Sequence, residues 1–146
     1  MAEQTSSSIV VDAPAADVMA VIADFPAYPS WATGVKRADV VKGPEAEDGR
    51  ATEVYFQLEV PPISDEYTLS YIWDDDREVT WTLVEGKMLK SLDGAYILRP
   101  DGSGTEVTYS LTLDVNIPLI GMLKRKGEKI LIDAALKGLK KRVESL

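Results

Sequence analysis

The sequence predicts an α+β domain in which a curved antiparallel sheet of about seven strands is covered by helices. Apolar and polar residues alternate through much of the region 35–115, which is typical of strands with one buried face. The spacing of apolar residues then becomes helical up to the C-terminus. The 146 residues suit a single domain. We therefore expect two short N-terminal helices and a long C-terminal helix packed across the concave face.

The N-terminal region predicts one strand and one helix. Residues 8–12 form a β-branched run, and we expect residues 1–7, which are mostly polar, to be a flexible N-terminal segment of a domain spanning 1–146. Pro14 and Asp17 favour a helix start, because proline is tolerated in the first turn and an acidic residue suits the positive helix end. Val18, Val21 and Ile22 give this helix its apolar stripe.

The aromatic segment 25–31 predicts a short helical turn packed over the sheet. Pro26 and Pro29 interrupt any long helix, while three aromatic side chains need a surface to cover. Trp31 is either a lid over a cavity or a staple that fixes the turn to the sheet.

About six strands follow in a meander. Turn residues at 43–44, 47–49, 61–62, 74–76 and 101–104 separate the alternating runs. The apolar parity defines the face expected to be concave and buried, and it includes Val54, Phe56, Leu58, Val60, Tyr67, Leu69, Tyr71, Trp73, Val79, Trp81, Leu83, Val107, Tyr109, Leu111, Leu113 and Val115.

The C-terminal segment after residue 118 predicts a long amphipathic helix. Its apolar side contains Ile120, Leu123, Leu131, Ala135 and Leu139, and lysines occupy the opposite side. Gly127, Ala134 and Gly138 lie on or beside the apolar side, where they indicate either room for a ligand or close approach of helix and sheet. Ile132, Leu136 and Val143 widen the apolar arc, which suggests a homodimer contact or cover by loops.

The composition excludes several reaction classes. Without histidine or cysteine the chain cannot form a Ser-His-Asp triad, a thiolate nucleophile, or an imidazole or thiolate metal site. A carboxylate site for Mg²⁺ or Ca²⁺ at residues 74–76 is formally conceivable, but adjacent acids at a turn are usually solvated. We expect no metal and no cofactor.

The charge distribution bears on partners. The net charge is −8, yet residues 124–146 hold eight basic against three acidic residues, a local charge of +5 that leaves −13 elsewhere. An acidic body argues against nucleic-acid binding, and the basic helix face is either solvated or contacts an anionic partner. No signal peptide or transmembrane segment is evident, so we expect a cytoplasmic protein.

Three segments resemble one superfamily. They are Tyr-Pro-Ser-Trp at 28–31, the pair 94–100 and 102–109, and the run Ile-Pro-Leu-Ile-Gly-Met-Leu at 117–123. The chain resembles the START-like superfamily, also called SRPBCC or birch-pollen-allergen-like, and within it the bacterial polyketide cyclase/dehydrase or lipid-transport group. The resemblance implies the helix-grip fold and a cavity for an apolar ligand between sheet and terminal helix.

The expected function is binding or carriage of a small apolar molecule such as a lipid, isoprenoid or polyketide. The apolar parity of the sheet supplies four tyrosines, Tyr67, Tyr71, Tyr96 and Tyr109. Their hydroxyls can fix the ligand's polar end, although these tyrosines can equally be core residues with satisfied hydroxyls. The alternatives are a cofactor-independent cyclase or dehydratase that uses a tyrosine with a carboxylate or arginine, and a module that binds a partner through the terminal helix. We expect a non-enzymatic protein with no identified catalytic residue. The candidate ligand-binding residues are Trp31, Phe56, Tyr67, Leu69, Tyr71, Trp81, Tyr96, Leu98, Tyr109, Leu111, Ile120, Leu123, Gly127, Leu131 and Ala134.

Overall fold

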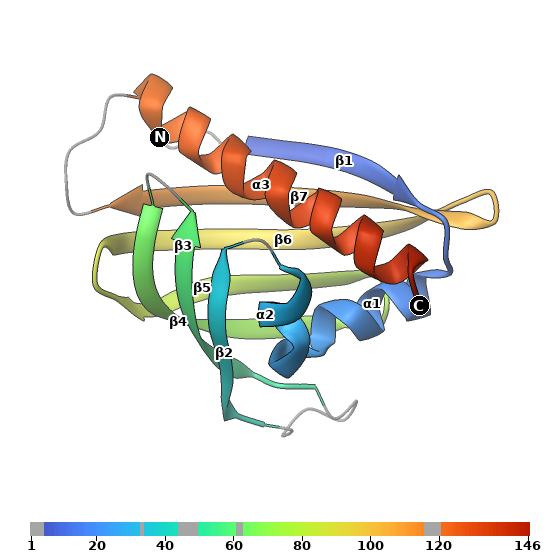
Figure 1. Ribbon diagram of the computed structural model, residues 1–146, viewed down its shortest axis with the longest axis horizontal. Coiled ribbons are helices and arrows are strands. Elements are labelled where there is room, and N and C mark those ends of the chain that lie inside the picture. Colours follow the sequence, from blue (N-terminus) through green and yellow to red (C-terminus); the bar gives the residue numbers. More distant parts are fainter. Residues whose placement is uncertain (1–4, 33, 44–49, 61–62, 116–120) are drawn as a thin grey trace.

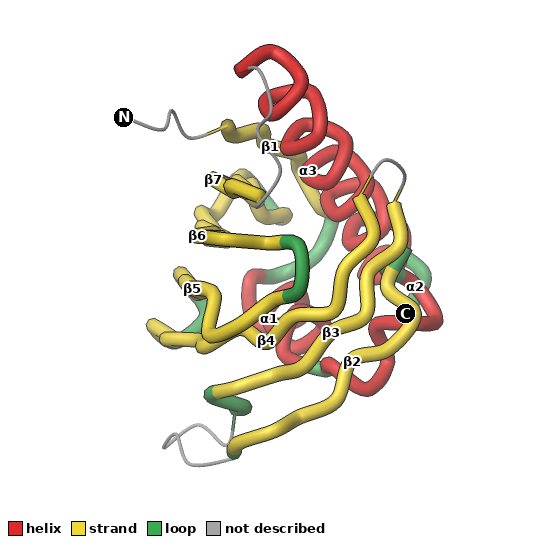
Figure 2. Tube along the Cα trace, turned by 90° about the vertical axis from the view of Figure 1, so that its left-hand side faces the viewer, coloured by secondary structure: helices red, strands yellow, loops and turns green. Residues whose placement is uncertain are grey.

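The computed structural model describes residues 5–32, 34–43, 50–60, 63–115 and 121–146, and it has the predicted helix-grip fold. One seven-stranded antiparallel sheet has the order β1-β7-β6-β5-β4-β3-β2 (Figure 1). The sheet curves, and α3 lies along its concave side (Figure 2). The elements are β1 (Thr5–Val11), α1 (Ala15–Ala23), a 3₁₀ turn (Phe25–Ala27), α2 (Tyr28–Trp31), β2 (Val35–Lys42), β3 (Glu53–Val60), β4 (Ile63–Asp74), β5 (Glu78–Gly86), β6 (Leu89–Asp101), β7 (Gly104–Val115) and α3 (Gly121–Glu144).

The first strand is longer than expected. β1 begins at Thr5, which pairs with Leu111 of β7, so the expectation of a flexible segment is wrong for residues 5–7. Burial alternates along the strand, and the Ser8 hydroxyl lies 2.8 Å from that of Thr108 on the neighbouring strand. The sequence did not indicate the start of this strand, because its first residues are threonine and serines rather than large apolar residues. Residues 1–4 lie outside the described residues.

The predicted helix and aromatic turn are confirmed. Pro14 caps α1, and Val18, Val21 and Ile22 are buried with Met19. The Phe25 ring that follows is completely buried, with its centroid 5.0 Å from that of Tyr71 on the sheet. The aromatic turn therefore packs onto the concave face as expected.

The hairpin turns at 74–76 and 101–104 are also confirmed. Asp75 and Gly102 adopt positive φ values of 47° and 61° at the two reversals. Pro44 and the turn signals at 47–49 and 61–62 lie outside the described residues.

The predicted inner face is concave and buried. Val79, Trp81, Val107 and Leu111 are at most 7% exposed, and the partly buried Leu83 and Tyr109 pack against the same core.

The terminal helix is buried on more than the side that faces the sheet. α3 packs on β1 and β7 and also contacts α1, and Ile132, Leu136 and Val143 are at most 5% exposed within the chain itself. Their burial explains the wide apolar arc without a second subunit, so this arc offers no exposed dimer contact. No described helix is both long and apolar enough to cross a membrane.

A buried carboxylate anchors α3 to the sheet. Glu128 is completely buried, accepts a 2.6 Å hydrogen bond from the Thr5 hydroxyl, and accepts a 2.8 Å bond from the backbone N–H of Leu113. Leu113 lies just beyond the last β1–β7 pair, so the carboxylate satisfies a donor that β1 does not reach.

Candidate functional site

A cavity of about 110 Å³ lies between the concave face and α3. Its wall comes from the sheet, from α2 and from the middle of α3. The predicted residues on this wall are Trp31, Phe56, Tyr67, Leu69, Tyr71, Trp81, Tyr96, Tyr109, Leu111, Leu131 and Ala134.

The remaining candidates are placed elsewhere. Leu98 and Gly127 are buried but do not line the cavity. Leu98 lies farther along β6, where it pairs with Val107, and it belongs to the core. Ile120 and the side chain of Leu123 lie outside the described residues.

Other wall residues were not predicted. Three of them follow the same patterns as the predicted residues. Leu58 follows Phe56 on the inner parity, Leu113 follows Leu111, and Ala135 lies on the apolar side of α3. The full set that sequence reasoning missed is Ile22, Tyr28, Ala32, Val35, Leu58, Leu89, Leu92, Leu113 and Ala135.

The four inward tyrosines form part of one aromatic cluster. The rings of Tyr96 and Tyr109 meet edge to face with centroids 4.7 Å apart, and both lie within 5.4 Å of the Trp81 ring. Tyr67 stacks on Phe56 with centroids 5.6 Å apart, and Tyr71 lies 5.7 Å from Trp81. Such offset and edge-to-face contacts are favourable and fix the ring positions.

The hydroxyls of these tyrosines are unusual for a packed core. Those of Tyr67, Tyr71, Tyr96 and Tyr109 make no hydrogen bond to any described residue, whereas that of Tyr28 donates to the backbone carbonyl of Ile22. Buried hydroxyls normally find partners. The absence of partners among the described residues favours the interpretation of these tyrosines as pocket lining over that of a plain core.

Burial keeps these phenols neutral. It is the main cause that raises the pKa of Tyr67, Tyr71, Tyr96 and Tyr109 above the usual value, because a phenolate loses its hydration inside the protein. The first three are raised further by electrostatic interaction with Tyr109 among other neighbours. At neutral pH the cavity thus presents hydroxyl donors rather than bases.

A glycine makes room for the central tryptophan. Trp81 pairs with Gly94 across β5 and β6, and a Cβ at position 94 would lie 2.4 Å from the indole Cε2 and Nε1 atoms. The ring therefore lies directly over the β6 backbone and leaves the space above it to the cavity.

Trp31 contacts both the cavity and α3. A Cβ at Gly138 would lie 3.1 Å from the Trp31 carbonyl oxygen and 3.6 Å from its ring, so Gly138 marks a close approach of α3 to α2. Ala134, one turn earlier, lies on the cavity wall instead. The two interpretations of the small residues on α3 therefore apply to different positions. The Trp31 indole N–H is buried and lacks a partner among the described residues.

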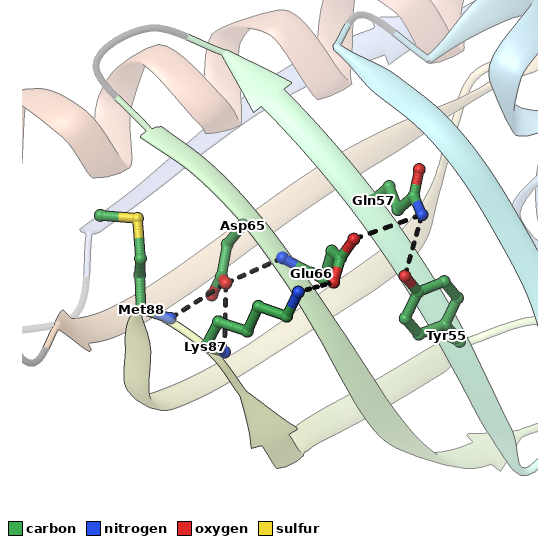
Figure 3. A network of polar contacts seen from close by, with 6 residues as sticks. All are labelled: Tyr55, Gln57, Asp65, Glu66, Lys87 and Met88. Atoms are coloured by element: carbon green, nitrogen blue, oxygen red, sulfur yellow. Dashed lines mark hydrogen bonds and ion pairs between the residues drawn. The ribbon is translucent and has the colours of Figure 1, made fainter.

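The buried carboxylate of Asp65 has a structural role. Asp65 accepts hydrogen bonds of 2.8 to 3.1 Å from the backbone N–H groups of Glu66, Lys87 and Met88 (Figure 3). It accepts a fourth, of 2.9 Å, from the backbone N–H of Leu89. It thereby fixes the β5–β6 turn and sets the position of Leu89 on the wall.

The other polar residues of Figure 3 belong to the outer face. Glu66 pairs with Lys87, and Gln57 donates to the Tyr55 hydroxyl at 3.0 Å and to Glu66 at 3.5 Å. No carboxylate, ammonium or guanidinium group lies on the described cavity wall.

The acidic turn at 74–76 is held by arginines. Asp74 pairs with Arg77 at 2.9 Å, and Asp76 pairs with Arg50 at 2.6 Å. Among the described residues, no group of three acidic side chains is close enough together to hold a metal ion.

Comparison with solved structures places the fold among known proteins. A START superfamily protein from Mycobacterium smegmatis superposes with a TM-score of 0.89 at 22% identity over 97% of each chain. The Zhui aromatase/cyclase from Streptomyces sp. R1128 superposes with a TM-score of 0.80 at 15% identity, covering 99% of this chain and 94% of that one. Both likenesses concern the fold.

Comparison with sequence families is more specific. No curated protein matches the chain in sequence. The family described as polyketide cyclase / dehydrase and lipid transport matches residues 2–144, nearly the whole chain. The chain therefore belongs to the polyketide cyclase/dehydrase and lipid transport family.

Proposed function

We propose that this protein binds or carries a small apolar molecule in the cavity between the sheet and α3. The observation that carries the proposal is a wall of aliphatic and aromatic side chains in which four tyrosine hydroxyls lack partners among the described residues. Ligand pockets typically combine such an apolar lining with a few polar groups that orient the ligand. The family's description is consistent with this function.

The cavity offers less support for a cyclase or dehydratase. Its ionisable wall groups are phenols whose pKa is raised by burial, so they would make poor general bases near neutral pH. Asp65 already accepts four backbone hydrogen bonds. The carboxylate or arginine partner that such a reaction would need is absent from the described wall.

The direct test is native mass spectrometry of freshly purified protein. A bound molecule should add a discrete mass that disappears on denaturation, and its identity would name the ligand. The finding that would count against binding is protein of bare mass that also fails to take up any apolar fluorescent probe.

A substitution at Ala134 tests the location. Leucine at this half-buried wall position should occupy cavity space, so probe affinity should fall while the ligand-free melting temperature holds or rises. Ala16→Leu on the exposed side of α1 is the matched control and should leave probe binding unchanged. In a packed core the same enlargement would cost about 1 to 3 kcal/mol. A destabilised Ala134→Leu variant with wild-type probe binding would place the site elsewhere.

A further inference from the structure

The cavity wall is rich in unused hydrogen-bond donors. The hydroxyls of Tyr67, Tyr71, Tyr96 and Tyr109 have no partner among the described residues, and neither does the buried indole N–H of Trp31. Tyr67, Tyr71 and Tyr96 are at most 8% exposed. An indole can only donate, and a neutral phenol has one proton to donate. A neutral phenol can also accept, but an acceptor on the ligand is the group that makes use of these protons.

The acceptor should be uncharged. Burying a carboxylate or phosphate without a cation is costly, and no Lys or Arg lies on the described wall. The lysines of α3 do not supply one, because Lys126, Lys129, Lys137 and Lys141 are exposed on the side away from the core. A fatty acid anion is thus a poor match, while a ketone, quinone or ester carbonyl satisfies the donors without bringing charge.

The size of the space also restricts the ligand. The volume of about 110 Å³ is somewhat smaller than the engineered cavity of roughly 150 Å³ that binds benzene. The surrounding rings are fixed by contacts with centroids 4.7 to 5.7 Å apart. The space therefore matches a molecule of about one ring, and a side chain on that ring requires the surrounding side chains to shift.

Taking the proposed function as its basis, we infer that the ligand class is a compact, neutral ring compound whose carbonyl oxygen accepts hydrogen bonds from the cavity tyrosines. Tyr109 is the leading donor, because it is the least buried of the four tyrosines and its ring is held by those of Tyr96 and Trp81. The site selects this class over both plain hydrocarbons and anionic lipids.

Three probes of nearly equal shape test the inference. They are butylbenzene, with no acceptor, benzylacetone, with one ketone, and hydrocinnamate, with a carboxylate at neutral pH. Calorimetric or ligand-observed NMR titration of the full chain, stripped of any copurified molecule, should rank benzylacetone tightest. We expect it to bind about 3- to 10-fold more tightly than butylbenzene, the contribution of one neutral hydrogen bond. Hydrocinnamate should bind most weakly.

A conservative variant identifies the donor. Tyr109→Phe keeps the ring and removes the hydroxyl, so it should erase most of the preference for benzylacetone while leaving butylbenzene affinity unchanged. Tyr55→Phe is the matched control, because the Tyr55 hydroxyl bonds Gln57 on the outer face (Figure 3). If Tyr109→Phe is inert, the same change at Tyr67, Tyr71 and Tyr96 tests the remaining hydroxyls.

The outcomes separate this inference from the proposed function. Equal affinity for benzylacetone and butylbenzene, unaffected by every tyrosine substitution, would overturn the carbonyl preference and leave an apolar binding protein. Tightest binding of hydrocinnamate would also overturn it. Failure of all three probes, together with failure of apolar dyes, would overturn both.

Discussion

The contact between Gly94 and Trp81 is the feature of the cavity that a single methyl group should test most sharply. In Gly94→Ala the new Cβ would lie 2.4 Å from the indole Cε2 and Nε1 atoms, whereas carbon atoms pack at about 3.5 to 4.0 Å. The ring must therefore move by about 1 Å. Gly94 is not among the residues with positive φ, so its backbone accepts alanine and the cost comes from the ring alone.

The magnitude follows from two opposing effects. Overpacking a core costs about 1 to 3 kcal/mol, and replacing glycine by alanine returns about 0.4 to 1 kcal/mol by restricting the unfolded chain. The expected net loss is about 1 to 2 kcal/mol, which lowers the melting temperature by about 2 to 8 °C at roughly 2 to 4 °C per kcal/mol. The displaced indole should also enter the cavity and weaken probe binding.

A double-mutant cycle with Trp81→Phe isolates the contact. Phenylalanine lacks the edge of the indole that carries Nε1, so Gly94→Ala should be nearly neutral in that background, giving a coupling energy of about 1 to 2 kcal/mol from thermal or urea unfolding. Gly102→Ala is the control: Gly102 has φ +61° and no atom within 4 Å of a built Cβ, so its cost should persist in both backgrounds. Equal destabilisation by Gly94→Ala with and without Trp81 would refute the assigned contact.

Three further predictions concern the buried polar groups. Glu128→Ala should destabilise the protein by about 2 to 4 kcal/mol in urea unfolding, because it leaves a void and an unpaired N–H at Leu113. Glu128→Gln should cost much less, since its amide can accept from the Leu113 N–H and donate to the Thr5 hydroxyl. Equal losses of stability in the two variants would contradict this role. Asp65→Asn should lower stability by about 1 to 3 kcal/mol and speed amide hydrogen exchange in the β5–β6 turn, because an amide has one acceptor oxygen for four N–H donors. Unchanged exchange in this turn would argue against Asp65 as the group that fixes it. The pKa values of the cavity tyrosines are higher in the folded than in the unfolded chain, so their contribution to stability should be constant below about pH 9 and fall as pH rises past the unfolded tyrosine pKa of about 10. Absorbance titration that shows every phenol ionising near pH 10 in fully folded protein would be incompatible with their burial.

Strand periodicity was enough to predict most of the part of the cavity wall that the inner face of the sheet supplies. Because successive side chains alternate between faces, one parity choice at Trp81 or Tyr109 determines the direction of every residue on that strand. Phe56 and Tyr67, both on the predicted inner parity, stack on each other across β3 and β4. Helical spacing similarly brought Leu131 and Ala134 to the wall.

Buried acids were not predicted, although a signal exists for one of them. Asp65 lies on the inner parity of β4, two residues before Tyr67, and a charge at such a position calls for a partner. Glu128 has no comparable signal: its partners Thr5 and Leu113 are distant in sequence and depend on where β1 ends beside β7. Secondary-structure patterns carry no information on such three-element junctions.

Whether small residues leave space or permit contact is a property of the opposing surface, and for this reason periodicity could not resolve it. Ala134 and Gly138 lie one turn apart on the same side of α3, so a helical wheel treats them alike. The structure separates them because Trp31 of α2 lies opposite Gly138, while inward rings of the sheet face the space at Ala134. Of those rings, that of Trp81 lies over the β6 backbone because Gly94 has no side chain, and a residue without a side chain gives no periodic signal. Two glycines on different elements thus influence how closely the walls approach, and the unpartnered hydroxyls around the space determine which ligand gains by entering.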